Sequence, residues 1–239
     1  MNYLNNLMLS SLAKPDFEII SPHLEQIELK LGHVIFEADS DIDYIYFPLS
    51  GIVSVLVATT NKRRLEVGIY GRDGIGGTPV LLNASRMPYR HLVQHAGEAV
   101  RLKSHILREA IVQSPSLLAS LLRHVEVFST QVAYTALANG SFVIEERLAR
   151  WLLMCRDRLD GNILTLTHEF LAVMLAVRRS GVTEAVHRLE GRGLIRASRG
   201  RVEILDRASL VAIAGESYGV PEKEHATLIG PWPPSASNG

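Results

Sequence analysis

The sequence predicts an α+β protein in which a strand-rich N-terminal part, one long helix and a mixed C-terminal part follow one another. Short runs of β-branched and aromatic residues, separated by Gly, Asp, Asn and Ser, fill the first third of the 239-residue chain. From about His105 onward, apolar residues recur instead at helical spacing. Near the C-terminus, two helical segments precede a pair of short strands, which indicates a second, smaller domain.

The N-terminal part, residues 1–114, has the pattern of a many-stranded sheet domain. The stretch HVIFEADSDIDYIYFPLSGIVSVLVATT and the later runs RRLEVGIY, RHLVQHA and EAVRLKS are rich in strand-forming residues, and glycines mark turns between them. Many short strands at this spacing favour a sandwich, a barrel or a jelly roll. The loop GRDGIGG lacks the Lys-Ser/Thr of a phosphate-binding loop, so we expect a turn of the sheet there.

A helix that starts near Ser104 leads to Pro115, which opens a long helix over residues 115–139. Apolar positions in this helix alternate in steps of three and four, which is the pattern of a coiled-coil seam. Alone in water such a helix would be unstable, so the sequence predicts a homodimer built on it. Asn139-Gly140-Ser141 is predicted to break the helix and to form the hinge between domains. The predicted seam consists of Leu118, Leu121, Val125, Phe128, Val132 and Thr135.

Residues 140–230 are predicted to form a C-terminal domain of the winged helix-turn-helix type. Helix, tight turn, helix and hairpin follow one another there, which is the order of that DNA-binding fold. Thr167 can cap the first of the paired helices, and a tail over residues 231–239 is predicted to be disordered. The elements are a helix over residues 143–159, a turn at 160–162, a helix over 169–175, a tight turn at 176–177, a helix over 178–190 and a hairpin around 199–200.

The second helix of the pair has one apolar and one polar face. Its apolar positions, Val182, Val186 and Leu189, recur in steps of four and three, so they are expected to pack on their own domain. The polar face would enter a major groove, arginines at the helix start would contact bases and phosphates, and hairpin arginines would reach the backbone. The residues predicted to contact DNA are Thr167, His168, Arg178, Arg179, Ser180, Thr183, Glu184, His187, Arg188, Arg199 and Arg201.

The composition sets limits on partners and cofactors. The chain is 47% hydrophobic and 21% charged with a formal net charge of zero, as in an ordinary globular protein. Residues 178–207 nevertheless hold eight Lys and Arg against four Asp and Glu. The single cysteine, Cys155, excludes an internal disulfide and a cysteine-ligated zinc or iron–sulfur site and is expected in the core. No membrane-length apolar run and no secretory signal are present, so the sequence predicts a cytoplasmic protein.

The order of these features resembles the Crp/Fnr family of bacterial transcription regulators. LGHVIFEADSDIDYIYFPLSGIVSVL is similar to the family's β-roll core, and LTHEFLAVMLAVRRSGVTEAVHRLEGRGLI is similar to its helix-turn-helix. In the recognition helix, Arg179 matches a family arginine, whereas Ser180 and Glu184 replace the usual Glu and Arg. The resemblance covers about residues 31–210. It implies a cyclic-nucleotide-binding-like β-roll (jelly-roll) sensor domain, a homodimer, an inverted-repeat operator in double-stranded DNA, contact with RNA polymerase and no membrane partner.

The effector site of the family is altered in this chain. Relatives typically hold the ribose of cyclic AMP with a Gly-Glu pair and the cyclic phosphate with an Arg beside Ser or Thr. This chain has Gly76-Gly77-Thr78 and then SRMPYR, so the resemblance implies a degraded cyclic-AMP site and no cofactor. An N-terminal cysteine cluster is absent, while nine histidines leave a haem ligand open. The residues expected at any effector site are Gly76, Gly77, Thr78, Arg86, Tyr89 and Arg90.

Two other classes of function stay open. One is a small-molecule or cyclic-nucleotide-binding module that acts through protein contacts, with a winged domain that no longer binds DNA. The arginines of the second helix and of the hairpin argue against it. The other is an enzyme, which is less favoured because no nucleophile–base pair, paired acidic site or metal cluster stands out. His91 and His95 share one face of a strand but lack further ligands.

Overall fold

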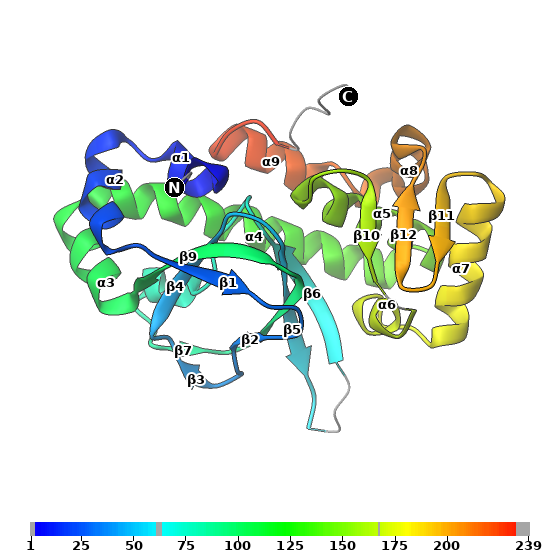
Figure 1. The fold of residues 1–239 in the computed structure, drawn as a ribbon, viewed down its shortest axis with the longest axis horizontal. Helices are drawn as coiled ribbons and strands as arrows, with labels where there is room; N and C mark the ends of the chain where they lie inside the picture. The colour runs from blue at the N-terminus through cyan, green and yellow to red at the C-terminus, as the bar shows by residue number, and fades with distance from the viewer. Residues whose placement is uncertain (1–2, 61–63, 167, 233–239) are drawn as a thin grey trace.

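The computed structural model describes residues 3–60, 64–166 and 168–232 and has the predicted α+β architecture (Figure 1). A roll of antiparallel strands forms the N-terminal part, and the long helix α4 runs along it. The helices and the short sheet of the C-terminal part lie toward the end of α4, on the right in Figure 1. No helix within these ranges is long and apolar enough to cross a membrane.

The roll consists of antiparallel sheets. One has the strand order β2-β8-β5-β6, a second has the order β1-β9-β4, and β3 pairs with β7. The turn into β5 requires glycine, because Gly51 has a φ of +80° and a Cβ there would lie 2.6 Å from the carbonyl oxygen of His95. The strands are β1 (Glu25–Leu29), β2 (Val34–Phe36), β3 (Ser40–Asp41), β4 (Tyr44–Pro48), β5 (Ile52–Ala58), β6 (Arg64–Tyr70), β7 (Arg86–Met87), β8 (Arg90–His95) and β9 (Gly97–Lys103).

Two short helices, α1 (Leu7–Ser11) and α2 (Lys14–Ile20), precede the strands, in a region for which the sequence pattern indicated only strands. Asn6 caps α1 by accepting a hydrogen bond from the backbone N–H of Leu9 at 3.1 Å. Its amide nitrogen donates to the carbonyl oxygens of Pro48 and Gly74, both at 2.9 Å. The N-terminal helices are therefore tied to the roll by a buried side chain. The predicted helix at Ser104 is α3 (Ser104–Gln113).

The long helix α4 (Pro115–Ser141) begins where the sequence predicts it. Ser114 caps it, accepting from the N–H of Leu117 at 3.3 Å. The helix continues through Asn139-Gly140-Ser141, so the prediction that these residues break it is wrong. One glycine costs a helix only about 1 kcal/mol relative to alanine, which is too little to end a helix whose neighbouring residue Ala138 is buried. The chain leaves the helix at Phe142, where the backbone is extended.

The predicted seam of α4 has the wrong phase at every second position. Leu121 is fully buried in the core of its own chain, so its assignment to a dimer contact is wrong. The ring of Phe128 packs against Gly68 of β6, where a Cβ would lie 2.9 Å from the ring. The hydroxyl of Thr135 accepts a hydrogen bond from Arg150 Nη2 at 3.1 Å, so Phe128 and Thr135 also turn toward their own chain. Phe128 and Thr135 are half-buried, as are the remaining seam residues, Leu118, Val125 and Val132.

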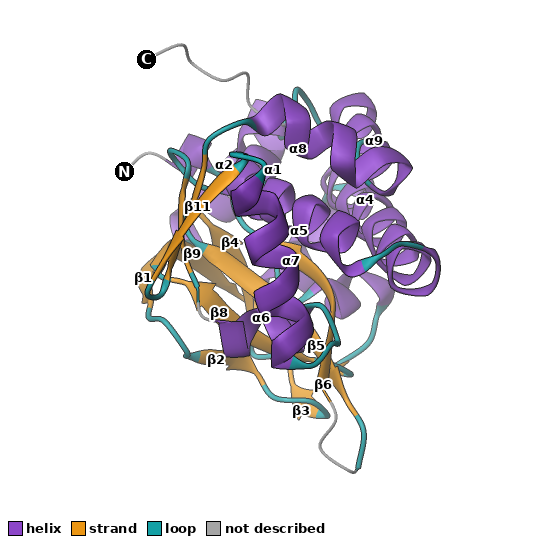
Figure 2. Ribbon diagram, turned by 90° about the vertical axis from the view of Figure 1, so that its right-hand side faces the viewer, coloured by secondary structure: helices purple, strands orange, loops and turns teal. Residues whose placement is uncertain are grey.

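The C-terminal part contains the predicted helix, tight turn, helix and hairpin (Figure 2). Ala176 has a φ of +50° in the turn, which lets the chain reverse between the paired helices. The sequence pattern did not reveal β10, which pairs with β12 and makes the sheet three-stranded. The elements are α5 (Ile144–Arg158), β10 (Ile163–Thr165), α6 (His168–Met174), α7 (Arg179–Gly191), β11 (Ile195–Ser198), β12 (Arg201–Ile204), α8 (Arg207–Ala214) and α9 (Val220–Leu228).

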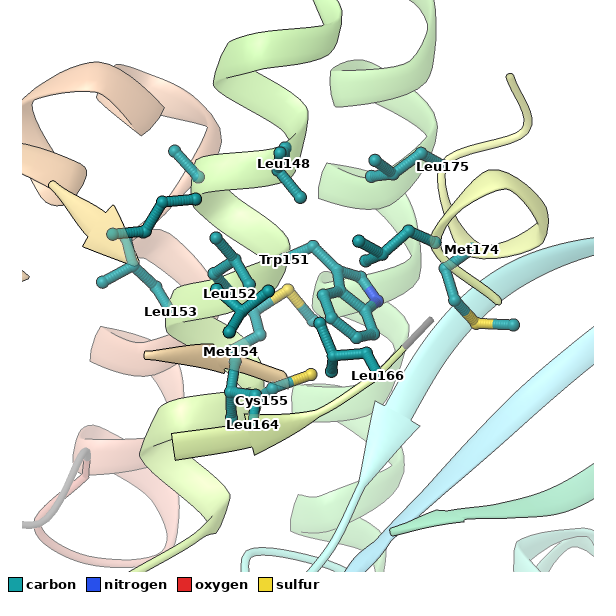
Figure 3. Close-up of a cluster of buried hydrophobic side chains, with 14 of the residues drawn as sticks. Leu148, Trp151, Leu152, Leu153, Met154, Cys155, Leu164, Leu166, Met174 and Leu175 are labelled. Atoms are coloured by element: carbon teal, nitrogen blue, oxygen red, sulfur yellow. The ribbon is translucent and has the colours of Figure 1, made fainter. Parts of the chain in front are cut away.

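One hydrophobic core surrounds α5 (Figure 3). Trp151 and Cys155 lie one turn apart on α5 and are both buried, as expected for Cys155. Figure 3 shows the indole of Trp151 pointing away from α5 toward Met174 of α6. The same cluster includes Ile52 and Ile69 of the roll. The C-terminal part and the roll are therefore packed against each other through a shared core.

After α8 the chain returns to α4 through residues 215–232, the C-terminal strap. Within it, α9 packs along α4, above it in Figure 1. Trp232 is only 6% exposed; its ring centroid lies 5.3 Å from that of His225, and the Arg158 guanidinium lies 5.5 Å above it. The prediction that disorder begins at residue 231 is therefore wrong for Trp232. Residues 233–239 lie outside the described residues.

Candidate nucleic-acid interface

The second helix of the helix-turn-helix, α7, separates its side chains into two faces. Val182, Val186 and Leu189 are buried, at 0–1% exposure, and pack on the core around α5. The opposite side of the helix is exposed along its whole length. It carries Ser180, Glu184 and His187. The helical period therefore places these residues as the sequence predicts, and their contact with DNA stays a prediction.

The arginines at the start of α7 are held at the edge of this exposed face. Arg178 is the N-cap residue, and Arg179 is the first residue of the helix; both side chains are exposed. The carbonyl oxygen of Arg179 accepts a hydrogen bond from the Thr183 hydroxyl at 3.1 Å, so Thr183 is turned toward its own helix. An anion approaching the start of α7 would meet both guanidinium groups and the positive end of the helix dipole.

Glu184 forms an ion pair on the exposed face of α7. Arg188 Nη2 lies 2.5 Å from Glu184 Oε1, one helical turn further along, and both side chains are more than half exposed. The pair fixes the carboxylate and offsets its charge, which reduces the repulsion that a lone glutamate would exert on DNA phosphates. The two residues were predicted as separate DNA contacts. Their spacing of four residues was the signal that they pair.

The wing is anchored to the recognition helix. Glu190, near the end of α7, accepts a hydrogen bond from the backbone N–H of Ala197 in β11 at 2.8 Å. The backbone N–H of Leu166 donates to the carbonyl oxygen of Gly200 at the wing tip, at 3.0 Å. The sequence pattern missed Glu190, because nothing local shows that its carboxylate reaches the next strand. Its contact places the exposed Arg199 and Arg201 beside α7.

A hollow of about 500 Å³ lies between α7 and the wing, and Arg179 and Arg199 contribute to its walls from opposite sides. His187 and Ser198 line it as well, together with Glu169 of α6. The hollow thus combines positively charged and neutral hydrogen-bonding groups with two carboxylates, those of Glu169 and Glu190. Thr167 lies outside the described residues, and His168 is the first residue of α6.

The residues expected at an effector site are not brought together. Gly76 forms a backbone bridge with Tyr46, with N···O distances of 2.8 and 3.0 Å. A Cβ on Gly76 would lie 2.3 Å from the Tyr70 hydroxyl oxygen. Gly77, with a φ of +95°, packs on Ile45 and precedes the short helix that Thr78 begins. These residues therefore lie against side chains of the roll interior.

Aromatic side chains fill the adjoining interior of the roll. The Tyr70 hydroxyl lies 3.0 Å from Nδ1 of His91, and both side chains are buried. Burial lowers the pKa of His91 to about 3, so the imidazole is neutral at physiological pH. Its ring meets the ring of Phe36 edge-on, with the centroids 5.1 Å apart. Met87, which follows Arg86, is also buried.

The other effector candidates lie elsewhere on the roll. Arg86 is exposed and donates to the carbonyl oxygen of Asp39. Tyr89 and Arg90 line a separate hollow of about 480 Å³, in which Arg90 Nε lies 3.3 Å from a Glu37 carboxylate oxygen. The expected effector residues are thus divided between the roll interior and its surface. No group of three or more His, Cys, Asp or Glu side chains suited to a metal occurs among the residues that the structure describes.

Comparison with protein families gives matches over both parts of the chain. Residues 26–114 match a cyclic nucleotide-binding domain, and residues 146–213 match a Crp-like helix-turn-helix domain. Comparison with curated protein sequences gives no significant match.

Solved structures show the same fold. A regulator of the Crp/Fnr family from Eubacterium rectale has a TM-score of 0.68 at 17% identity, covering 87% of this chain and 97% of the other. One from Thermus thermophilus has a TM-score of 0.65 at 21% identity, covering 80% of this chain and 98% of the other. FixK2 from Bradyrhizobium japonicum has a TM-score of 0.70 at 16% identity, again with coverage of 80% and 98%.

Proposed function

The chain belongs to the Crp/Fnr family of DNA-binding transcription regulators, and we propose that it acts in the cytoplasm as a homodimer that reads an inverted-repeat operator. The observation that carries this proposal is the exposed face of α7, on which Ser180, Glu184 and His187 follow a pair of arginines at the helix start. A helix of these dimensions fits the major groove. The wing arginines beside it supply the backbone contacts that hold the helix in register.

The proposed dimer uses the half-exposed flank of α4. Along this flank the side chains follow one another in steps of four and three, which is the spacing of a two-stranded coiled coil. The flank keeps three residues of the seam predicted from sequence and replaces the three that turn toward their own chain. It consists of Leu118, Leu122, Val125, Ser129, Val132 and Ala136, which are half-buried or exposed.

The two-fold symmetry of such a dimer determines the form of the operator. The two α7 helices would enter successive major grooves on one side of the duplex, about 34 Å apart. Arg179 is suited to a bidentate contact with guanine. Glu184 can only accept hydrogen bonds, so it favours the amino group of cytosine or adenine, whereas the arginine usual in the family favours guanine. We therefore propose an operator that differs from the family's common one at the base pair facing Glu184, and a bound regulator that contacts RNA polymerase.

We further propose that cyclic AMP is not the effector. A cyclic phosphate buried in the roll would need a charged partner, and an unpaired buried anion costs several kcal/mol. The positions facing that site hold Gly77 and the buried Met87, while Tyr70 and His91 occupy the adjoining interior. Calorimetric titration is expected to give no binding at micromolar concentrations of cyclic AMP. A micromolar or tighter dissociation constant would overturn this part of the proposal.

The proposed function is tested by selecting bound DNA from a random pool. The wild-type protein is expected to enrich an inverted repeat with half-sites about one helical turn apart. The Arg179→Ala variant run in parallel is expected to enrich a repeat that is degenerate at one position in each half-site. Enriched sequences without two-fold symmetry would contradict the proposal. Repeating the selection with candidate effectors would identify any that strengthen binding.

A further inference from the structure

Three polar side chains lie buried where the helix-turn-helix unit packs on the roll. Ser54 of β5, Glu66 of β6 and Gln94 of β8 come from neighbouring strands of the four-stranded sheet and are at most 4% exposed. Helices α5 and α6 cover this face of the sheet, because Trp151, Cys155 and Met174 contact the three side chains. A permanently buried sheet face normally carries apolar residues. Ser, Glu and Gln are instead the residue types expected on a sheet face that is exposed to water part of the time.

The polar groups contact α5 at two points, Trp151 and Cys155. The Trp151 indole N–H donates to Glu66 Oε1 at 2.6 Å. The Ser54 hydroxyl donates to Gln94 Oε1 at 2.5 Å, and Gln94 Nε2 lies 3.5 Å from the Cys155 sulfur. Residues of two separately matched domains thus complete each other's hydrogen bonds.

One carboxylate oxygen among these groups has no hydrogen-bond partner. Glu66 Oε2 is buried without a hydrogen-bond partner, and the adjacent Ser54 hydroxyl gives its own proton to Gln94. A neutral Glu66 can donate from Oε2 to the Ser54 oxygen, whereas an ionised Glu66 leaves a buried charge beside it. Burial raises the pKa of Glu66 to about 7, although the neighbouring Ser54 hydroxyl, the hydrogen bond from Trp151 and the charges of Arg150 and Arg158 oppose the rise.

We propose that this contact is a proton-dependent latch: with Glu66 neutral the helix-turn-helix unit is held on the roll, and with Glu66 ionised the unit is released. The bond to Trp151 joins the sensor sheet directly to the helix that precedes α6 and α7. Release lets water reach the carboxylate and frees the orientation of α7 relative to the roll. The mobile unit turns about Phe142 and Val143, where the backbone between α4 and α5 is extended.

Within this contact Glu66 is the group that changes charge near neutral pH; beyond Arg150 and Arg158, burial also raises the pKa of Glu222 in α9. Arg150 and Arg158 of α5 stay protonated. Burial raises the pKa of the Cys155 thiol well above its usual value, so it stays neutral. On the elements beyond, burial lowers the pKa of His91 to about 3 and that of His124 to about 4, so both are neutral. Ser54, Gln94, Trp151 and Met174 do not titrate in this range.

The direction of the pH effect follows from the raised pKa of Glu66. Docking favours the protonated form, so the latch is strongest below the ordinary pKa of a glutamate, near 4.5. It weakens as pH rises toward about 7 and changes little above that value. Within this window the ratio of docked to released protein falls by up to about tenfold for each pH unit.

Hydrogen–deuterium exchange of the full-length protein tests the latch. Protection of α6 amides, corrected for the intrinsic exchange rate, is expected to fall by up to about 100-fold between pH 5 and pH 7, relative to α3 in the sensor part. Glu66→Gln keeps an acceptor for Trp151 and adds a donor for Ser54, so its α6 protection is expected to be independent of pH. If the Gln variant does not fold, Glu66→Met, which is apolar and of similar length, replaces it in the same measurement. The matched control is Glu98→Gln, which removes an exposed carboxylate from β9 and keeps the wild-type profile.

Two results would overturn the latch: α6 protection that does not change with pH relative to α3, or a pH dependence that survives in both Glu66 variants. The measurement uses no DNA, so its outcome is independent of the proposed operator. In a second assay, operator affinity measured at pH 6 and pH 8 is expected to change in the wild-type protein and to stay constant in Glu66→Gln. A change of equal size in both proteins would count against coupling of the latch to DNA.

Discussion

Asp73 and Arg158 form an ion pair inside the molecule, with Arg158 Nη2 2.5 Å from Asp73 Oδ2 and both side chains at most 4% exposed. Asp73 follows the last strand of the four-stranded sheet, and Arg158 ends α5. Burial acts to raise the pKa of Asp73, but the charges of Arg158 and His225 outweigh it and lower that pKa. Two charges taken out of water in this way hold the parts together only as long as both are present.

Removing the carboxylate should therefore be costly. Asp73→Asn is expected to lower the free energy of unfolding by about 3–5 kcal/mol, because Arg158 would be left buried without a counter-charge. Asp160→Asn is the matched control: it breaks the Arg72–Asp160 pair, whose carboxylate is exposed, and is expected to cost under about 1 kcal/mol. Urea denaturation of both variants measures the difference. Equal losses would show that burial of the Asp73 pair is unimportant for stability.

The lowered pKa of Asp73 also predicts a dependence on acid. The stabilisation that Asp73 provides is fully present above the pKa of an unfolded aspartate, about 3.9, and is lost as pH falls through that value toward the lower folded pKa. Wild-type protein is therefore expected to lose more stability between pH 5 and pH 3 than Asp73→Asn does. Denaturation curves at several pH values check this, and parallel pH profiles would contradict it.

Arg179 and Arg201 are expected to contribute differently to DNA binding. Arg179→Ala should relax sequence preference at one position per half-site, where a bidentate contact with guanine supplies about 1–3 kcal/mol. Arg201→Ala, on the wing, should weaken binding to all sequences alike and reduce the salt dependence of binding, because it removes a phosphate contact. Affinities for a panel of single-base operator variants at two salt concentrations separate the two effects. Unchanged preference in Arg179→Ala would exclude it from base reading.

At the scale of elements, α4 shows what the spacing of apolar residues can and cannot predict about the faces of a helix. Sequence spacing predicted a long amphipathic helix and three residues of its half-exposed flank, but it placed Leu121 on that flank in place of Leu122. Apolar residues cover both the side of α4 that packs on the roll and the flank beside it. A repeat of three and four fits either stripe, so the sequence alone cannot separate a contact within the chain from one between chains.

Substitutions can distinguish the side of α4 that packs on the roll from the flank proposed as the dimer contact. Leu122→Glu combined with Val125→Glu is expected to give a folded monomer, because like charges would face each other across the dimer contact. Leu121→Glu is expected to unfold the protein, because it places a charge in the core. Light scattering gives the molecular mass, and circular dichroism gives the fold. A dimer that survives the double substitution would exclude this flank as the contact.

The recognition helix was the part most readily predicted, because its buried and exposed faces differ in polarity and follow the helical period. The interior of the roll could not be predicted in the same way. Glu66 lies in the alternating run RRLEVGIY, where it has the pattern of a solvent-facing strand residue, and only the packing of α5 buries it. Likewise β10 needs β12 as its partner, and no local signal marks a three-residue strand.

At the scale of the whole molecule, the C-terminal strap joins regions that are far apart in sequence. His225 of α9 lies with Nε2 3.2 Å from the carbonyl oxygen of Asp73, and Arg123 of α4 donates to the carbonyl oxygen of Leu228 at 3.3 Å. Arg150 of α5 donates from Nε to the carbonyl oxygen of Ser217 at 2.8 Å. The strap thus contacts the roll, the long helix and the DNA-binding part at once.

Loss of the strap's terminal anchor should weaken the whole molecule. Trp232→Ala is expected to lower the free energy of unfolding by about 3–5 kcal/mol, the usual cost of removing a large buried aromatic side chain. Leu205→Ala, at a side chain that is 46% exposed, is the control and is expected to change stability by less than about 0.5 kcal/mol. Chemical denaturation measures both. A Trp232 variant as stable as the control would show that the strap does not stabilise the rest of the molecule.

Because the strap follows the wing in the sequence, it is also the last of these parts to be made during synthesis. Domains tend to fold from the N-terminus as they leave the ribosome, so the roll and α4 emerge first. Asp73 and Arg158 then lack their final contacts until His225 and Trp232 have been made. A nascent chain interrupted after the wing would present charged groups and an uncovered side of α4 to chaperones and proteases. Packing of α9 along α4 thus covers these groups only after the wing has been made.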